Sequence, residues 1–320
     1  MRQNHACTHQ DGDFLRNLVR QRAHCVSKNH NTVAPTTLAR FCLMPCPTMT
    51  EAPARPCYTH PLEILWQDED MVVVYKPAGW LVHRTPLARH ETRFVLQSLR
   101  DQIGRHVWPV HRLDQGTCGV LVFALHKEAC QKLAACFMDH TAQKHYLALA
   151  RGWLADEVEV DYALKPDDAP EDAPAQSAQT TLRCLAHLEW PEAYDKRHAS
   201  TRISLVEALP KTGRRHQIRR HLKHESHPII GDATHGKGPL NRWWAERIGL
   251  HRLWLHAHAL EIPHPCTGEV MRFCADWRQL GAVPEVQQWQ QLLAIPGWQA
   301  TARGLPASCG LQLPTTATMP

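Results

Sequence analysis

Short apolar runs recur along most of the chain, and no regular series of helical segments separates them. Residues 62–66 and 71–75 are two such runs joined by the polar turn 67–70, which is the pattern of a β-hairpin. The other strand-like runs are residues 119–125, 146–150, 181–189, 201–209 and 253–262. Parallel α/β folds need a crossover, usually a helix, between successive strands. The sequence therefore predicts an α+β fold with a mostly antiparallel, mixed sheet core and flanking helices and loops.

Four segments show helical periodicity and are expected to flank that sheet. In residues 127–140, Ala129, Leu133 and Phe137 recur every four residues, as on the packed side of a helix. The other predicted helices are residues 91–103, 213–224 and 285–293. Between residues 231 and 238 the repeated glycines predict a loop.

Residues 1–60 differ from the rest of the chain, because they combine Cys, His, Pro and Thr without sustained periodicity. We expect them to form a disordered N-terminal extension, and Met49 offers an alternative start. Residues 61–300 should form the folded domain, and residues 301–320 a disordered tail. Within the domain, residues 166–177 are rich in Asp, Ala and Pro and predict a flexible surface insertion.

Hydropathy and charge exclude several classes of protein. No apolar run approaches the roughly 18 residues of a membrane span, and the N-terminus lacks the apolar stretch of a signal peptide. We therefore expect a cytoplasmic protein whose 12 cysteines are reduced thiols. Cys42 and Cys46 have no downstream pair at metal-ligand spacing, so we predict no metal site.

Basic residues cluster in one predicted helix, although the formal net charge of the chain is only +5. Residues 211–223 contain six Lys or Arg residues and no acidic residue. Such clustering is typical of contact with nucleic acid phosphates. The alternative is a solvated helix face, which would normally mix charges of both signs.

Two further segments carry candidate catalytic residues. Asp114 lies in a polar turn between apolar segments, where a rigid sheet would present its carboxylate; an ordinary Asp-capped turn is the alternative. Tyr146 enters a strand, as a core residue or as a ring on which a base stacks. Arg219 borders the packed face of the basic helix and needs an anionic partner, for which Asp114 is the candidate. Such a pair would keep the carboxylate ionised.

Taken together, these segments resemble the motifs of the RluA-type pseudouridine synthases. The resemblance runs in order from about Leu62 to Phe273 and includes His111-Arg112-Leu113-Asp114. The other matching segments are Tyr75 to His83, Lys144-His145-Tyr146 through Gly152, Thr212 to Arg219, and His227-Pro228-Ile229-Ile230-Gly231-Asp232. One motif departs from the family pattern, because Cys118 stands where Ser is common after Thr117, so a local change in hydrogen bonding is expected there.

The resemblance implies that residues 61–300 form a catalytic domain that isomerises uridine in RNA without a cofactor. Asp114 would act on the target nucleotide, either as a nucleophile or as a base that removes a ribose proton. Tyr146 would stack on the base and assist proton removal from C5, and Arg219 would pair with Asp114. Arg112 would fill the space that the flipped base leaves. The other implied RNA-binding residues are His111, Lys76, Arg214, Arg215 and Gln217.

Several stretches narrow the expected substrate. Residues 62–69, 101–104, 151–154 and 250–257 are similar to family members that modify uridine 65 of tRNA, near the acceptor end of the T stem. RNA, with tRNA first, is thus the expected partner, and neither a membrane nor an obligate protein partner is implied. Two alternatives stay open: the same chemistry on ribosomal RNA, and an RNA-binding protein that has lost catalysis.

Overall fold

Eleven strands of the described chain pair into one mixed sheet, whose order along the sheet differs from the order along the chain. In the computed structural model, the main path is β1-β2-β4-β9-β5-β8-β7-β11, with β3, β6 and β10 paired at its sides. The structure describes residues 61–84, 91–167, 169–170, 172–249, 251–305 and 312–313. The predicted extension over residues 1–60 and most of the predicted tail over residues 301–320 lie outside these ranges.

The first part of the sheet is built around two strands that are buried along their whole length. β2 (Met71–Lys76) and β4 (Cys118–Ala124) pair antiparallel, and every residue of both is buried. Continuous apolar runs of this kind belong to strands covered on both faces. β1 (Ile64–Gln67) pairs with β2 as the predicted hairpin, and β3 (Trp108–Pro109) pairs with β4.

The second part of the sheet is a set of antiparallel neighbours. β5 (Gln143–Arg151) pairs with β8 (Thr201–Pro210), and β8 pairs with β7 (Gln179–Trp190). β6 (Glu157–Asp161) and β11 (Gln299–Ala300) pair with β7. In β6 only Val158 and Val160 are apolar, and they alternate with exposed acidic residues, so this strand contains no apolar run of the kind that predicted the others.

β9 (Leu255–Pro263) joins the two parts, because it lies between β4 and β5. It pairs parallel with β4 and antiparallel with β5, and β10 (Val270–Cys274) pairs with its other end. The β4 contact requires glycine at position 119: its φ is +116°, and a Cβ there would lie 2.1 Å from the carbonyl oxygen of Ala257. The mixed sheet of the predicted α+β class is thus confirmed.

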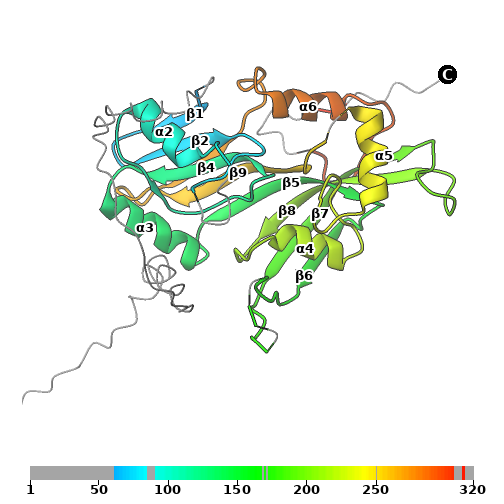
Figure 1. Cartoon of the computed structure of the whole chain (residues 1–320), viewed down its shortest axis with the longest axis horizontal. Helices are drawn as coiled ribbons and strands as arrows, with labels where there is room; N and C mark the ends of the chain where they lie inside the picture. Colours follow the sequence, from blue (N-terminus) through cyan, green and yellow to red (C-terminus); the bar gives the residue numbers. More distant parts are fainter. Residues whose placement is uncertain are drawn as a thin grey trace, which may run out of the picture. The chain divides into compact units, whose positions relative to one another are not determined.

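Five helices of the described chain flank this sheet (Figure 1). α2 (Val95–Ile103) and α3 (Lys127–Met138) lie beside the part formed by β1, β2, β4 and β9. α4 (Gln217–His224) and α5 (Gly238–Ile248) lie beside the part formed by β5, β7 and β8, and α6 (Pro284–Leu293) follows β10. None of the described helices is long and apolar enough to cross a membrane.

The helices also show where the sequence-based predictions were wrong. The segment 231–238 forms the predicted loop as far as Lys237, but the helix that follows it, α5, was not predicted. The first turn of α5 contains Pro239, and Gly249, with φ of 67°, follows its last residue. Proline at the start and glycine after the end are typical of helix boundaries. The helix predicted over residues 213–224 begins only at Gln217, because His216 adopts a left-handed backbone conformation.

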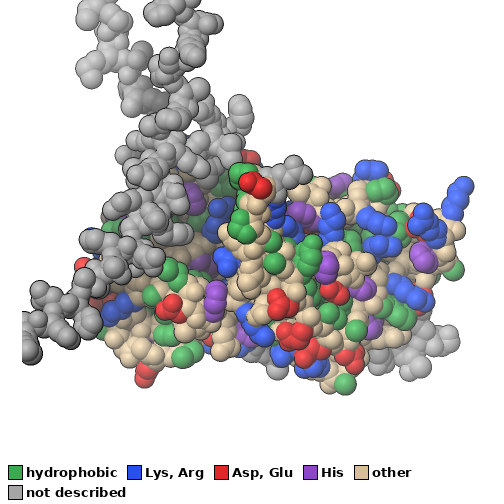
Figure 2. Space-filling model, turned by 90° about the horizontal axis from the view of Figure 1, so that it is seen from below, with side chains coloured by type: hydrophobic (Ala, Val, Ile, Leu, Met, Phe, Trp, Pro, Cys, Tyr) green, Lys and Arg blue, Asp and Glu red, His purple; other side chains and the backbone are tan. Residues whose placement is uncertain are grey.

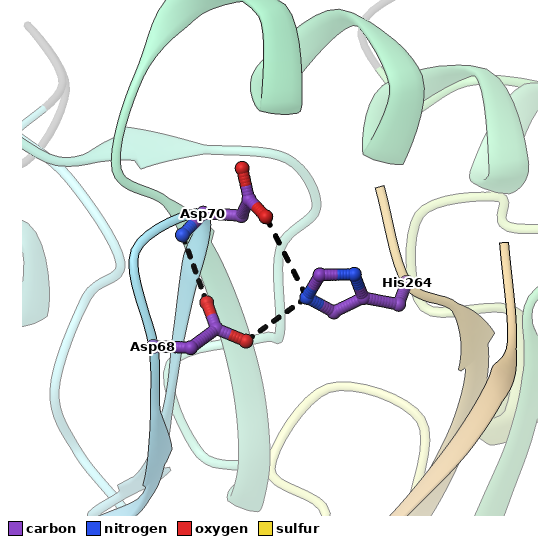
Figure 3. A group of neighbouring side chains, drawn as sticks. All are labelled: Asp68, Asp70 and His264. Atoms are coloured by element: carbon purple, nitrogen blue, oxygen red, sulfur yellow. Dashed lines mark hydrogen bonds and ion pairs between the residues drawn. The ribbon is translucent and has the colours of Figure 1, made fainter. Parts of the chain in front are cut away.

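A cluster of charged side chains ties the turn after β1 to the turn after β9 (Figure 3). The Nε2 atom of His264 lies 2.9 Å from Asp68 Oδ2 and 3.7 Å from Asp70 Oδ2. Asp68 Oδ1 accepts hydrogen bonds from the backbone N–H groups of Asp70 and Met71. Among the described residues, this is the one group of carboxylates and imidazole close enough to hold a metal ion.

The hydrogen bonds of His264 identify this cluster as a structural clasp. Its Nδ1 atom accepts from the backbone N–H groups of Cys266 and Thr267, each at 3.2 Å. The ring proton therefore lies on Nε2 and is donated to Asp68, so the atom that faces the carboxylates is not a free metal ligand. Burial alone would raise the pKa of Asp68, but its hydrogen bonds, including that from His264, outweigh burial and lower the pKa from 3.8.

Replacing Asp68 by Asn tests the clasp. An amide has only one acceptor atom, so it cannot serve both His264 and the backbone N–H groups, and we expect the free energy of unfolding to fall by about 1 to 3 kcal/mol. Because the pKa of Asp68 is lowered on folding, the difference should be present above pH 3.8 and vanish as the pH falls below it. Urea denaturation at several pH values measures this.

The matched control is Asp101→Asn, which removes an exposed carboxylate paired with Arg100 and should change stability little. Equal unfolding midpoints for Asp68→Asn and the control would contradict a stabilising clasp. A rise in the melting temperature of the wild-type protein on addition of Zn²⁺ would show that the cluster binds metal instead.

Candidate active site

Asp114 lies where the two parts of the sheet meet, in the turn that leads from β3 into β4. The backbone closes this turn, because Thr117 N–H donates to the Asp114 carbonyl oxygen at 3.1 Å. The side chain of Asp114 is 20% exposed, so one part of the carboxylate faces solvent and the other faces the protein. A turn held in this way presents an acid group in a fixed position.

Lys76, at the end of β2, stabilises the turn that contains Asp114 from inside the protein. Its ammonium group donates to the carbonyl oxygens of Pro77, Gln115 and Thr117 at 3.0, 3.1 and 2.7 Å. Burial lowers the pKa of Lys76 to about 8, although nearby negative groups, including Asp114, raise it. With an exposure of 0%, Lys76 has no surface with which to contact RNA, in contrast to the role expected from the resemblance.

Arg219, on α4, links two carboxylates. Its Nη1 atom lies 3.1 Å from Asp114 Oδ2, so the predicted pair is present in the structure. Its Nε and Nη2 atoms lie 2.6 and 2.8 Å from the two carboxylate oxygens of Asp232. The side chain of Arg219 is only 9% exposed, and such a guanidinium group needs compensation of this kind. Two-point binding by Asp232 fixes the direction in which Nη1 reaches Asp114.

Asp232 was not among the predicted site residues. Besides Arg219, its carboxylate accepts the backbone N–H groups of Thr234 and His235. Burial would raise the pKa of Asp232, but Arg219 and these N–H groups outweigh burial and lower it. Asn241 of α5 holds the same loop through Gly231 N–H and the Asp232 carbonyl oxygen. The segment 227–232 matches a family motif, which was the signal that could have identified Asp232.

Tyr146 lies on β5 beside an irregularity in the strand pairing. The register between β5 and β9 shifts between His145 and Tyr146, and bulges of this kind re-aim a side chain next to active sites. The ring is half-buried and packs against both buried apolar clusters of the described chain. Burial raises the pKa of the Tyr146 phenol, and the negative charge of Asp114 raises it further.

His216 is a second residue of the site that the sequence did not predict. Its Nε2 atom lies 3.9 Å from Asp114 Oδ2, and its Nδ1 atom lies 3.0 Å from Nε2 of His235. Its φ of 55° is uncommon for a residue other than glycine, and residues held in this way often occur at functional sites. A backbone conformation of this type cannot be read from the sequence.

The predicted RNA-binding residues fall into two groups. Arg112, Arg214 and Arg215 are exposed. Gln217 is 4% exposed and bonds within the protein, to Thr212, Arg214 N–H, Gln179 and Thr180.

His111 belongs to the second group as well. Its Nε2 atom accepts from Val122 N–H, and its ring stacks on Phe137. Burial lowers the pKa of His111 to about 3, so the ring is neutral and cannot attract phosphate.

One face of the molecule is strongly charged. In the view from below, Lys and Arg side chains gather over one side of the visible face together with histidines, whereas acidic side chains gather beside them (Figure 2). On α4, Arg220 donates to the carbonyl oxygen of Lys165 and lies near Asp167. Arg215, just before α4, also lies near Asp167. Asp167, in the segment 166–177, thus balances part of the positive charge of the basic cluster that the sequence predicted.

Cys118 does not hold the turn that contains Asp114. Its thiol is buried and lies 3.3 Å from Nδ1 of His256, and Arg252 donates to the sulfur at 3.6 Å. Burial raises the pKa of the Cys118 thiol, so it stays protonated at neutral pH. The hydrogen bonds of the turn come instead from the backbone and from Lys76, and the departure from the family pattern leaves them in place.

Comparisons with known proteins agree with this fold and geometry. The RNA pseudouridylate synthase family model matches residues 70–224. The chain is 48% identical to the tRNA pseudouridine synthase C of Vibrio cholerae, over 74% of this chain and 97% of that protein. It is 44% identical to the tRNA pseudouridine synthase C of Yersinia pestis, over 75% of this chain and 93% of that protein.

Among solved structures, human RNA Pseudouridylate Synthase Domain Containing 1 superposes with a TM-score of 0.54 at 25% identity, over 74% of this chain and 96% of that chain. Human RNA Pseudouridylate Synthase Domain Containing 4 has the same TM-score at 24% identity and supports the fold alone. The chain therefore belongs to the RNA pseudouridylate synthase family. It is an enzyme that isomerises uridine to pseudouridine, and the expectation of a protein without catalysis is not favoured.

Replacing Asp232 by Asn tests whether this residue positions Arg219. Removing one charge of a buried pair typically costs about 3 to 5 kcal/mol, and the loosened guanidinium group should also hold Asp114 less firmly. We expect a lower melting temperature together with a lower kcat and a nearly unchanged KM for RNA. Steady-state kinetics measure the change in kcat and KM, at a temperature where the wild type and the Asp232→Asn variant are both folded.

The matched control is Asn241→Ala, which loosens the same loop but leaves both charges of the pair in place. It should lower stability with a smaller loss of kcat than Asp232→Asn. Equal losses of kcat in the two variants would contradict a specific action of Asp232 through Arg219.

Proposed function

We propose that this enzyme modifies tRNA, with uridine 65 as the target, and that Asp114 carries the reaction. The names of the two bacterial relatives support a tRNA substrate, because the similarity covers nearly all of their length. The observation that carries the assignment of Asp114 is its pairing with Arg219 at a partly exposed turn. A tRNA substrate also fits an enzyme that works in the cytoplasm.

The isomerisation breaks the bond between N1 of the base and the ribose and forms a bond from C5 to the same ribose carbon. C5 loses a proton and N1 gains one, so the reaction needs no redox partner or group donor. Arg219 bonds the side chain of Asp114 and holds it in place, and Asp114 either attacks the ribose or removes a ribose proton. The ring of Tyr146 provides a surface on which the turned base stacks.

The target uridine lies in a stem and must leave the stack, at a cost of a few kcal/mol. Arg112 is exposed two residues before Asp114, in the same turn, and fills the vacated space in this proposal. Arg214 and Arg215, exposed just before α4, contact phosphates near the site. Lys76, His111 and Gln217 support the site from inside the protein instead of touching RNA.

Replacing Asp114 by Asn tests the assignment, because the amide keeps the size of the side chain and removes its charge. With tRNA transcripts that carry [5-³H]uridine, we expect tritium release by the wild type and none by the variant. Both proteins should bind the transcript, as measured by filter retention. Sequencing-based mapping of pseudouridine in the product should find it at position 65.

The matched control is Asp101→Asn on α2, which should release tritium at the wild-type rate. Tritium release by Asp114→Asn would overturn the catalytic role of Asp114. Modification of ribosomal RNA fragments with unchanged tRNA would overturn the proposed substrate.

Replacing Arg215 by Gln tests the RNA-binding surface. Loss of one phosphate contact should weaken tRNA binding and reduce the slope of log K against log salt concentration by about 1. The control is Arg100→Gln, on α2, which removes an equally positive side chain from the other part of the sheet. Identical slopes for wild type, Arg215→Gln and Arg100→Gln would place the RNA elsewhere.

A further inference from the structure

A carboxylate of α6 bonds a loop that lies next to the catalytic turn. Glu285, in the first turn of α6, accepts a hydrogen bond from the backbone N–H group of Ala78 through Oε1 at 2.8 Å. The two residues are 207 positions apart in the chain. The family model ends at residue 224 and does not include α6. The proposed reaction by itself leaves this contact without a role.

Ala78 belongs to the loop 77–80, which follows β2 and contacts the turn that carries Asp114. Gly79 N–H donates to the carbonyl oxygen of Gln115, the residue after Asp114, at 2.8 Å. The side-chain amide of Gln115 donates back to the Gly79 carbonyl oxygen at 3.2 Å. Gly79 has a φ of +80°, which favours glycine and makes the loop a tight turn. A shift of Ala78 would therefore also shift the backbone next to Asp114.

The other end of the contact is rigid, because α6 is anchored in the core. Trp289 of α6 packs edge-on against Trp254, with ring centroids 4.9 Å apart. The guanidinium group of Arg252 lies over the Trp254 ring at 4.4 Å and donates to the Glu285 carbonyl oxygen at 3.4 Å. The buried residues of α6 are Val286, Trp289, Leu292 and Leu293. Glu285 can thus hold the loop in a fixed position.

The charge of Glu285 also acts on Lys76, which bonds the same turn. Burial lowers the pKa of Lys76 to about 8, whereas Cys118, Asp114 and Glu285 raise it. The ammonium group has three N–H donors, one for each backbone carbonyl oxygen that it contacts, and a neutral amine has only two. A negative charge that favours the ammonium form therefore helps to keep all three bonds.

We propose that Glu285 is a positioning residue for the reaction at Asp114, an inference that rests on the proposed function. Its hydrogen bond to Ala78 holds the loop 77–80 against the catalytic turn, and its charge favours the ammonium form of Lys76. Glu285 itself contacts no substrate atom. It acts through the loop and through Lys76 on the position of the Asp114 carboxylate.

Two substitutions at Glu285 separate the hydrogen bond from the charge. Glu285→Gln keeps an oxygen that accepts the Ala78 N–H group, and Glu285→Ala removes both the acceptor and the charge. In single-turnover conversion of tRNA transcripts at neutral pH, we expect Glu285→Ala to be slower by roughly 10- to 100-fold, because a misplacement of about 1 Å can slow a reaction to this extent. Glu285→Gln should stay close to the wild-type rate. Transcript binding, measured by filter retention, should be the same for all three proteins.

The pH profile gives a second measurement. As the pH rises through the pKa of Lys76, near 8, the side chain loses a donor and the wild-type rate should fall. Without the negative charge of Glu285 the pKa of Lys76 is lower, so in Glu285→Gln this fall should occur at lower pH. A carboxylate that only stabilises the fold would leave the pH of the fall unchanged.

The matched control is Glu128→Ala, which removes the acidic residue in the first turn of α3. Both Ala variants lose the attraction between a carboxylate and a helix N-terminus, but only Glu285→Ala releases the loop. Glu128→Ala should therefore keep the wild-type rate and pH profile. Equal rates in the two Ala variants would overturn the proposal. Equal rate losses in Glu285→Gln and Glu285→Ala would overturn the role of the hydrogen bond, and an unshifted pH profile the action through Lys76.

Should Glu285→Ala not fold, Ala78→Pro removes the same hydrogen bond from the side of the loop and leaves α6 unchanged. Proline has no N–H group and is common directly before a glycine of positive φ in a turn. Ala78→Pro should show the rate loss expected for Glu285→Ala, and a wild-type rate would overturn the proposal. If Asp114→Asn is inactive in the same assay, the proposed function stands and only the role of Glu285 fails.

Discussion

The site depends on one guanidinium group that is shared between two carboxylates. Arg219 is fixed by Asp232 on one side, and this fixes the position of Asp114 on the other. The second carboxylate solves a charge problem, since an arginine this deeply buried could not be held by a partly exposed acid alone. It also frees Asp114, which needs to neutralise only part of the positive charge and can turn toward a substrate.

Around this group, the two parts of the sheet contribute different things. The part with β2 and β4 supplies a rigid turn, held on its inner side by Lys76. The part with β5 and α4 supplies the ring of Tyr146, the guanidinium group of Arg219 and the exposed arginines. The two parts meet at β9, the strand that both share.

The sequence predicted the apolar strands, the α+β class and the pairing of Asp114 with Arg219, because these depend on local hydropathy and on the need of a buried charge for a partner. It did not predict α5, since glycines hid boundaries that Pro239 and Gly249 mark. Nor could it show that Lys76 and Gln217 point inward. A basic or polar side chain in a motif looks the same whether it bonds a phosphate or a backbone carbonyl, and only the fold separates the two.

The late position of β9 in the chain has a consequence for how the enzyme is made. β9 pairs with β4 only after the intervening strands and helices, through α5, have been synthesised. Until then the edges of β4 and β5 that it will cover lack their partner, and long-range pairing of this kind is slow. During translation, the turn with Asp114 is thus synthesised long before α4 and β9, which complete the site around it. The enzyme therefore stays inactive until almost the entire domain has left the ribosome.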